Sequence, residues 1–175
     1  ASRYLTTSDT TYRDSTIING SVSMGGLDST AALIGMMIYK GKVSVSDGSP
    51  VLKRLHIREN QGVGLRLSGV KLAISDIEVK SNNNLDGNNQ RGGGIYVSGS
   101  TVSFTNAVVD SNVTKYDYEG GGLYSNNSHI TITRSQFNDN VAYRGGGIYS
   151  VNDSSFTMTH STVARDSSRL RGGGM

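Results

Sequence analysis

The chain has 175 residues, which is enough for one domain with a hydrophobic core. The absence of cysteine excludes disulfides and thiolate metal sites, and a net charge of +3 without a run of four basic residues argues against a nucleic-acid-binding surface. Apolar residues make up only 35% of the chain, glycine is abundant and proline occurs once, which favours many short strands joined by tight turns over a helical bundle.

The first 34 residues carry an incomplete version of the pattern that follows. A partial repeat, DSTIIN at residues 14–19, precedes a glycine-rich and then apolar stretch at residues 20–34, which we expect to form a lateral loop or a small cap. The longest apolar run, residues 31–39, is about half of what a membrane-spanning helix needs. We therefore divide the chain into a partial N-terminal rung with an irregular insertion, residues 1–34, and a repeat region, residues 35–175.

Glycine triplets mark the repeat region. They stand at 92–94, 120–122, 145–147 and 172–174, with steps of 28, 25 and 27 residues, and two degraded copies precede them. The repeats thus begin near residues 35, 62, 92, 120, 145 and 172. A period of this length is typical of a unit that buries its apolar face only by stacking on its neighbours.

Each repeat contains three short apolar patches with a period of two residues, the signature of β-strands. The first patch holds Ile38, Leu65, Ile95, Leu123 and Ile148; the second holds Val43/Val45, Leu72/Ile74, Val102/Phe104, Ile130/Ile132 and Phe156/Met158; the third holds Ile57, Val79, Val109, Phe137 and Val163. This pattern predicts an all-β protein, a right-handed parallel β-helix (β-solenoid) with three strands per rung, about five complete rungs and partial ends.

A polar residue recurs three positions after the third patch. These residues are Asn60, Asn82, Asn112, Asn140 and Asp166. An amide side chain can accept a hydrogen bond from one rung and donate to another, so we expect a structural ladder that satisfies backbone groups at a buried turn.

Tyrosines recur beside the inward residues of the first patch, at Tyr39, Tyr96, Tyr124 and Tyr149, with Arg66 in one rung. We expect them to point outward. Their stacked rings would either stabilise the rungs and shield the sheet edge or offer a contact face to a glycan or a neighbouring rod.

The repeat is interrupted at two polar segments, residues 81–91 and 113–119. We expect both to be protruding loops, which are the usual binding sites on a regular solenoid. Tyr116 and Tyr118 in the second segment are the first candidates for a partner contact.

Residues Gly120–Leu123 read GGGL, and Phe137–Asn140 read FNDN. This pairing resembles the repeats of chlamydial polymorphic outer membrane proteins, which carry GGA[ILV] and FxxN, and the resemblance covers residues 35–175. The chain differs in having glycine at the third triplet position and mostly Val or Ile in place of Phe. Similar repeats occur in autotransporter passenger domains and in large eukaryotic surface proteins. The resemblance implies an extracellular or surface-displayed β-helix, commonly an adhesin or structural element, and carries over no catalytic residue.

No catalytic or metal site emerges from the sequence, and no cofactor is expected. The acids of the later rungs fall mostly in turns and lack hydrolase-type motifs, and the three histidines do not share a ligand spacing. Four N-glycosylation motifs occur, about as many as chance would give, and Asn126 and Asn152 are the better acceptors among them.

We therefore expect a non-enzymatic structural or adhesive segment of an extracellular or cell-surface protein, part of a longer stalk or an end-to-end filament. Its partners would be other copies or further repeats of the same protein, because the last triplet opens a rung that must meet a continuation. Surface glycans are further possible partners. The alternatives are a polysaccharide-active lyase or hydrolase, or a glycan- or ice-binding module that uses the Ser/Thr-rich outer face of the second strand.

Overall fold

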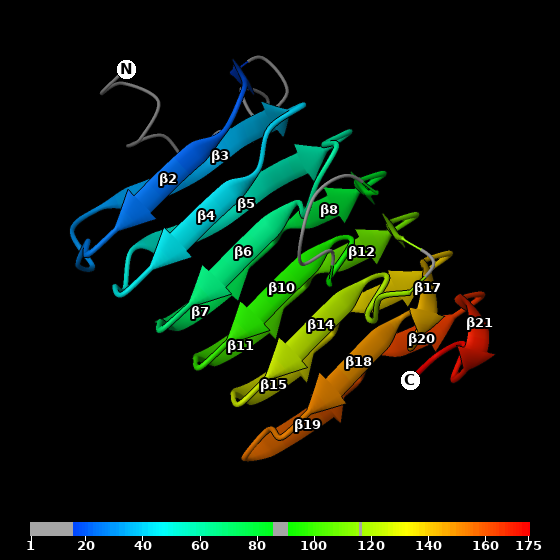
Figure 1. The fold of residues 1–175 in the computed structure, drawn as a ribbon. Coiled ribbons are helices and arrows are strands. Elements are labelled where there is room, and N and C mark those ends of the chain that lie inside the picture. Colours follow the sequence, from blue (N-terminus) through cyan, green and yellow to red (C-terminus); the bar gives the residue numbers. More distant parts are fainter. Residues whose placement is uncertain (1–15, 86–90, 116) are drawn as a thin grey trace.

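The computed structural model describes residues 16–85, 91–115 and 117–175. These residues form an all-β parallel solenoid of about five turns. No helix occurs among them, and so there is no helix that could cross a membrane in this part of the chain. Successive turns stack as rungs along one axis (Figure 1). The predicted β-solenoid with three strands per rung is confirmed, and its strands form three parallel sheets.

The first sheet has six strands that pair in register, so that Ile95 lies between Leu65 and Leu123. Alternate residues of each strand face the interior, as the period of two predicts. In rung order the strands are β2 (Val22–Gly25), β4 (Val43–Ser46), β6 (Leu65–Ser68), β10 (Ile95–Ser98), β14 (Leu123–Asn126) and β18 (Ile148–Val151).

The second sheet has eleven strands and combines the second and third apolar patches of the rungs. Two long strands, β3 (Ala32–Tyr39) and β5 (Val51–Arg58), carry both patches. The second patches of later rungs form β7 (Lys71–Ser75), β11 (Thr101–Thr105), β15 (His129–Thr133) and β19 (Ser155–Thr159). The third patches form β1 (Ile17–Asn19), β8 (Glu78–Lys80), β12 (Val108–Asp110), β16 (Gln136–Asn138) and β20 (Thr162–Ala164).

The third sheet has two of its four strands in the segments where the sequence suggested loops. It has four short strands: β9 (Asn83–Asn84), β13 (Val113–Thr114), β17 (Val141–Arg144) and β21 (Ser167–Arg171). The number of residues per turn differs along the solenoid. Facing residues are 21 positions apart in the sequence at Ser21 and Lys42, but 30 positions apart at Asn82 and Asn112. The longer turns thus use their additional residues for this sheet, and both interrupted segments take part in it.

Three bends in each rung are made by single residues in the left-handed backbone region, with φ between 49° and 68°. Only a few residue types adopt this conformation readily, which explains the many Gly, Asn and Asp residues here. The first bend follows the first-sheet strand and holds Gly26, Asp47, Gly69, Gly99, Asn127 and Asn152. The second bend holds Gly35, Arg54, Asp76, Asn106, Arg134 and His160. The third bend holds Lys40, Glu59, Ser81, Ser111, Asp139 and Arg165.

The core fills the space between the first and second sheets. Phe104 and Phe137 are its largest fully buried side chains, and stacked Ile, Leu and Val residues from every rung surround them. Burial of each such side chain contributes on the order of 1.5–3 kcal/mol, which offsets the entropy lost by ordering so many short strands.

The glycine triplets stand where the third sheet returns to the first. Gly120 has a φ of 71°, and a Cβ atom on Gly121 would lie 2.7 Å from the backbone N and O of Val141. A Cβ atom on Gly122 would lie 3.0 Å from Nδ2 of Asn140. The triplets are therefore required by backbone conformation and by close approach to the next strand and to the asparagine ladder.

The register of the first rungs differs from the sequence-based alignment. Val43 pairs with Leu65 and so belongs to the first patch, whereas Ile38 pairs with Ile57 and belongs to the third. The early rungs lack glycine triplets, and both alignments satisfy the period of two. Residues 20–34 are not only a loop or cap, because β2 and the start of β3 pair within the sheets.

Candidate functional site: the C-terminal edge of the solenoid

The predicted polar ladder runs along the third bend. The side-chain oxygen of each member accepts the backbone N–H of the preceding member, for example Asn82 N to Asn112 Oδ1 at 3.1 Å and Asn112 N to Asn140 Oδ1 at 3.0 Å. Nδ2 of Asn112 donates both to Asn140 Oδ1 and to the backbone oxygen of Val79. Asn82, Asn112 and Asn140 are completely buried. The ladder has a direction, because every rung depends on an acceptor from the rung that follows it.

Asp166 ends this ladder in the last rung. Its Oδ1 accepts hydrogen bonds from the backbone N and from Nδ2 of Asn140, at 2.8 and 2.9 Å. Its Oδ2 is buried and has no hydrogen-bond partner among the described residues. It takes the position of the asparagine Nδ2, close to Gly147 as Asn140 Nδ2 is close to Gly122. Burial raises the pKa of Asp166 above its usual value, although the hydrogen bonds from Asn140 act in the opposite sense.

Two further ladders were missed by the sequence analysis. At the first bend, Ser100 Oγ accepts Val70 N and Ser128 Oγ accepts Ser100 N, at 3.1 and 3.2 Å. At the second bend, Ser135 Oγ accepts Ala107 N at 3.0 Å. The sequence signal was a serine directly after the bend residue in the later rungs, at Ser100, Ser128, Ser135 and Ser161, but serine is too common in this chain for the spacing to attract attention.

In the described part of the chain, the last-rung strands β18, β19, β20 and β21 are the end strands of their sheets. Only the start of β18 continues onto a further segment, where Ile148 N donates to Gly174 O at 2.8 Å. Phe156 and Met158 of β19 are partly exposed, whereas the residues that face them one rung earlier, Ile130 and Ile132, have no exposed surface. An unpaired, partly apolar edge of this kind is a template for another strand.

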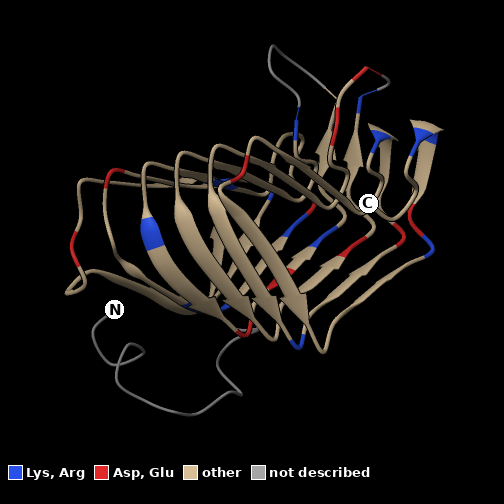
Figure 2. Ribbon diagram, turned by 90° about the horizontal axis from the view of Figure 1, so that it is seen from below, with Lys and Arg blue, Asp and Glu red and all other residues tan. Residues whose placement is uncertain are grey.

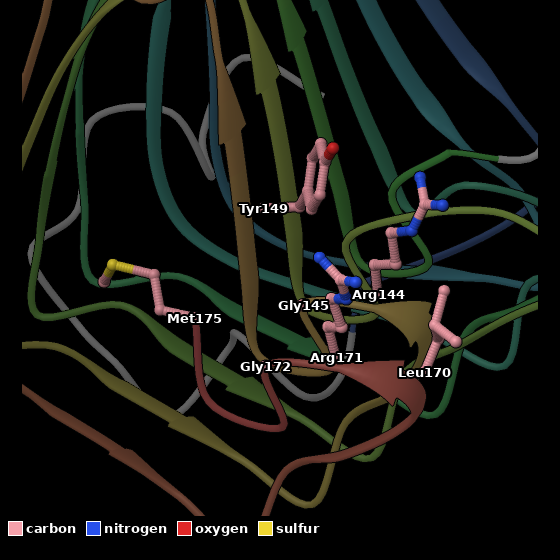
Figure 3. Close-up of a pocket in the computed structure, with 7 residues that line it drawn as sticks. All are labelled: Arg144, Gly145, Tyr149, Leu170, Arg171, Gly172 and Met175. Atoms are coloured by element: carbon pink, nitrogen blue, oxygen red, sulfur yellow. The ribbon is translucent and has the colours of Figure 1, made fainter.

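A pocket of about 520 Å³ opens at this edge. Tyr149, Leu170 and the two arginines Arg144 and Arg171 are among its lining residues (Figure 3). Arg144 lies 3.7 Å from a carboxylate oxygen of Glu119, but Arg171 forms no ion pair with a described residue. Elsewhere, acidic and basic residues are distributed over the strands and bends of the solenoid (Figure 2).

The tyrosine column forms only in part. Tyr96, Tyr124 and Tyr149 stack with ring centroids 5.4 and 5.9 Å apart, and the Arg66 guanidinium lies 4.4 Å from the Tyr96 ring centroid. Tyr96 and Tyr124 are only 8% and 6% exposed, so these two rings offer little surface to a partner. Burial raises the pKa of Tyr124 above its usual value.

Tyr39 does not belong to this column, because it pairs with Arg58 in the second sheet. Tyr118 is half-buried beside the third sheet, with its ring centroid 6.0 Å from the Arg91 guanidinium. Tyr116 lies outside the described residues. Of the described tyrosines, Tyr39 lies apart from the column, whereas Tyr118 and Tyr124 both lie beside the Arg91 guanidinium.

The two proposed glycosylation residues differ in accessibility. Asn152 is exposed at the first bend, whereas Asn126 is half-buried at the end of β14. Within residues 16–85, 91–115 and 117–175, no group of three or more His, Asp or Glu side chains is placed to hold a metal ion.

The chain matches no protein-family model, and searches of curated proteins and of solved structures find no significant match. The observations identify a parallel β-solenoid of about five turns without assigning it to a family.

Proposed function

We propose that the chain is a non-enzymatic structural segment of an extracellular or cell-surface protein, within a longer stalk or an end-to-end filament. The observation that carries the proposal is the regular stack of about five turns, held together by parallel pairing within three sheets and by the asparagine ladder. A solenoid of this kind is an extended element that grows by the addition of rungs. The motif resemblance to surface-displayed β-helices supports the location.

The end-to-end filament predicts that chains associate through the partly exposed apolar residues of β19. A charge placed among these residues should prevent the association. Met158→Lys places an ammonium group at the partly exposed end of the core, whereas Thr157→Lys adds the same charge to the adjacent outward-facing position of β19. We expect sedimentation velocity to show concentration-dependent association for the wild type and for Thr157→Lys, and only monomers for Met158→Lys. Equal behaviour of all three chains would contradict the end-to-end filament, and cleavage of a polysaccharide by the purified chain would contradict the non-enzymatic assignment.

A second candidate is the binding of acidic glycans in the pocket at Tyr149. An aromatic ring beside two guanidinium groups suits a carboxylated sugar, because the ring contacts the sugar face and arginine pairs with a carboxylate. Titration calorimetry with oligogalacturonate would test this candidate, with Arg171→Gln as the variant expected to lose binding. A wild-type chain that does not bind would exclude it.

A further inference from the structure

A second pocket lies on the third sheet and shares no lining residue with the pocket beside Tyr149. Its volume is about 440 Å³, within the usual range for small-molecule sites. Leu85 lines it from the first interrupted segment of the repeat and Val113 from the second, and Val141 of β17 pairs with Val113. The pocket therefore joins the two segments in which the sequence predicts binding.

The floor of this pocket is aliphatic. Leu85 and Val141 are 42% and 38% exposed, although most of the large apolar side chains in the described solenoid are buried. Val113 and Ala142 add apolar surface, and none of the described lining residues is aromatic. Apolar side chains that gather on a surface mark binding sites, and the absence of a ring from the lining favours an aliphatic chain over a sugar as the ligand.

The polar groups of the floor already have partners within the solenoid. The backbone N–H groups of Val113 and Val141 donate to backbone oxygens of the preceding rung at 2.9 and 2.8 Å. The Thr114 hydroxyl donates to the backbone oxygen of Tyr118 at 3.2 Å. A ligand rich in hydroxyl groups would lose water there without gaining hydrogen bonds in exchange, which is costly. The floor therefore selects for apolar surface.

Two basic residues complete the lining. Lys115 and Arg169 are both exposed, so their apolar stems border the pocket while their charged groups stay hydrated at its opening. Arg169 stands at a β-bulge, because β17 has one residue between two pairs that β21 separates by Arg169 and Leu170. The bulge directs Arg169 to this pocket and Leu170 to the pocket beside Tyr149. No acid is among the described lining residues, so the opening attracts an anion.

We propose that this pocket binds a free medium-chain fatty acid. The hydrocarbon chain lies against Leu85, Val113 and Val141, where its burial provides the affinity. The carboxylate pairs with the Lys115 ammonium and the Arg169 guanidinium at the opening, which fixes the direction of the chain. This site adds a ligand to the proposed structural function and does not depend on it.

The test titrates the full chain with octanoate, octanol and acetate and follows the backbone amides by two-dimensional NMR. For the wild type, octanoate should cause saturable shifts centred on residues 113–115, 141–142 and 169. Octanol should bind several-fold more weakly because it lacks the charge, and acetate should not bind because it lacks the chain.

Substitutions separate the apolar floor from the basic opening. Val141→Asp should weaken octanoate binding by about tenfold or more, because it replaces apolar floor by a like charge. Val108→Asp is the matched control, since Val108 is a strand valine of similar exposure, 37%, outside this pocket, and it should bind octanoate as the wild type does. Lys115→Gln and Arg169→Gln should each weaken octanoate binding by about two- to fivefold and leave octanol binding unchanged.

Three results would overturn the proposal. The first is a wild type in which octanoate causes no saturable shifts at these amides. The second is equal octanoate binding by Val141→Asp and Val108→Asp. The third is wild-type binding of octanol or acetate as tight as that of octanoate, because the site would then not require both the chain and the charge. The wild-type shifts and the exposed Lys115→Gln variant decide the matter even if Val141→Asp does not fold.

Discussion

Asp166→Asn should stabilise the protein, although it removes a residue that accepts two hydrogen bonds. The amide keeps the oxygen that accepts from Asn140 and replaces the unpartnered Oδ2 by a donor. The new amide N–H would be placed like that of Asn140, the ladder residue one rung earlier, whose Nδ2 donates to the backbone oxygen of Val109 at 3.0 Å. One additional buried hydrogen bond is worth about 1 kcal/mol, so we expect the free energy of unfolding to rise by about that amount at neutral pH.

The gain should depend on pH with a defined sign. Burial raises the folded-state pKa of Asp166 above the reference value of 3.8, so the wild type is favoured when this carboxyl is protonated and loses stability as pH rises through the folded-state pKa. Asp166→Asn has no such loss. The difference between the two proteins should therefore be small in acid and reach its full size above the raised pKa.

Urea unfolding from about pH 3 to pH 8 measures this difference, and the exchange rate of the Asn140 amide reports it locally if the last rung frays first. Asp139→Asn is the matched control, because the Arg165 guanidinium lowers the pKa of Asp139 and the pH dependence has the opposite sign. The reasoning is refuted if Asp166→Asn is less stable than the wild type at neutral pH, or if the difference does not change with pH.

Three further substitutions test the interior of the solenoid. Asn112→Ala leaves two donors of the preceding rung unsatisfied and should cost about 3 kcal/mol in urea unfolding, whereas the half-buried Asn126→Ala should cost less than about 0.5 kcal/mol. Gly121→Ala forces a Cβ into neighbouring backbone and should cost about 3 kcal/mol or prevent folding, against about 1 kcal/mol for Gly99→Ala, where a Cβ meets nothing within 4 Å. Burial raises the pKa of Tyr124 above 10.0, so the protein is more stable with this ring neutral and loses that stability as pH rises through the raised pKa. A difference absorbance titration of the wild type against Tyr124→Phe should show that Tyr124 ionises late. An onset at the ordinary tyrosine pKa would contradict the burial of this ring.

Local patterns in the sequence were sufficient for the fold class. The period of two residues indicates strands, and the steps between glycine triplets indicate stacked rungs, because both follow from side-chain direction along a single chain segment. The asparagine spacing likewise located a column of ladder residues, since a residue at a fixed offset in every rung must stack on its counterparts.

Contacts between rungs decided the rest. The alignment of Val43 with Leu65 depends on pairing between rungs. In rungs that lack the triplets, the period of two does not decide which strand of one rung pairs with which strand of the next. The burial of Tyr96 and Tyr124 depends on neighbouring rings and on Arg66 and Arg91, which come from other rungs. The polar ladders at the three bends depend on the direction of hydrogen bonds from one rung to the next. That direction is a property of the stacked backbone, and no single segment of the sequence contains it.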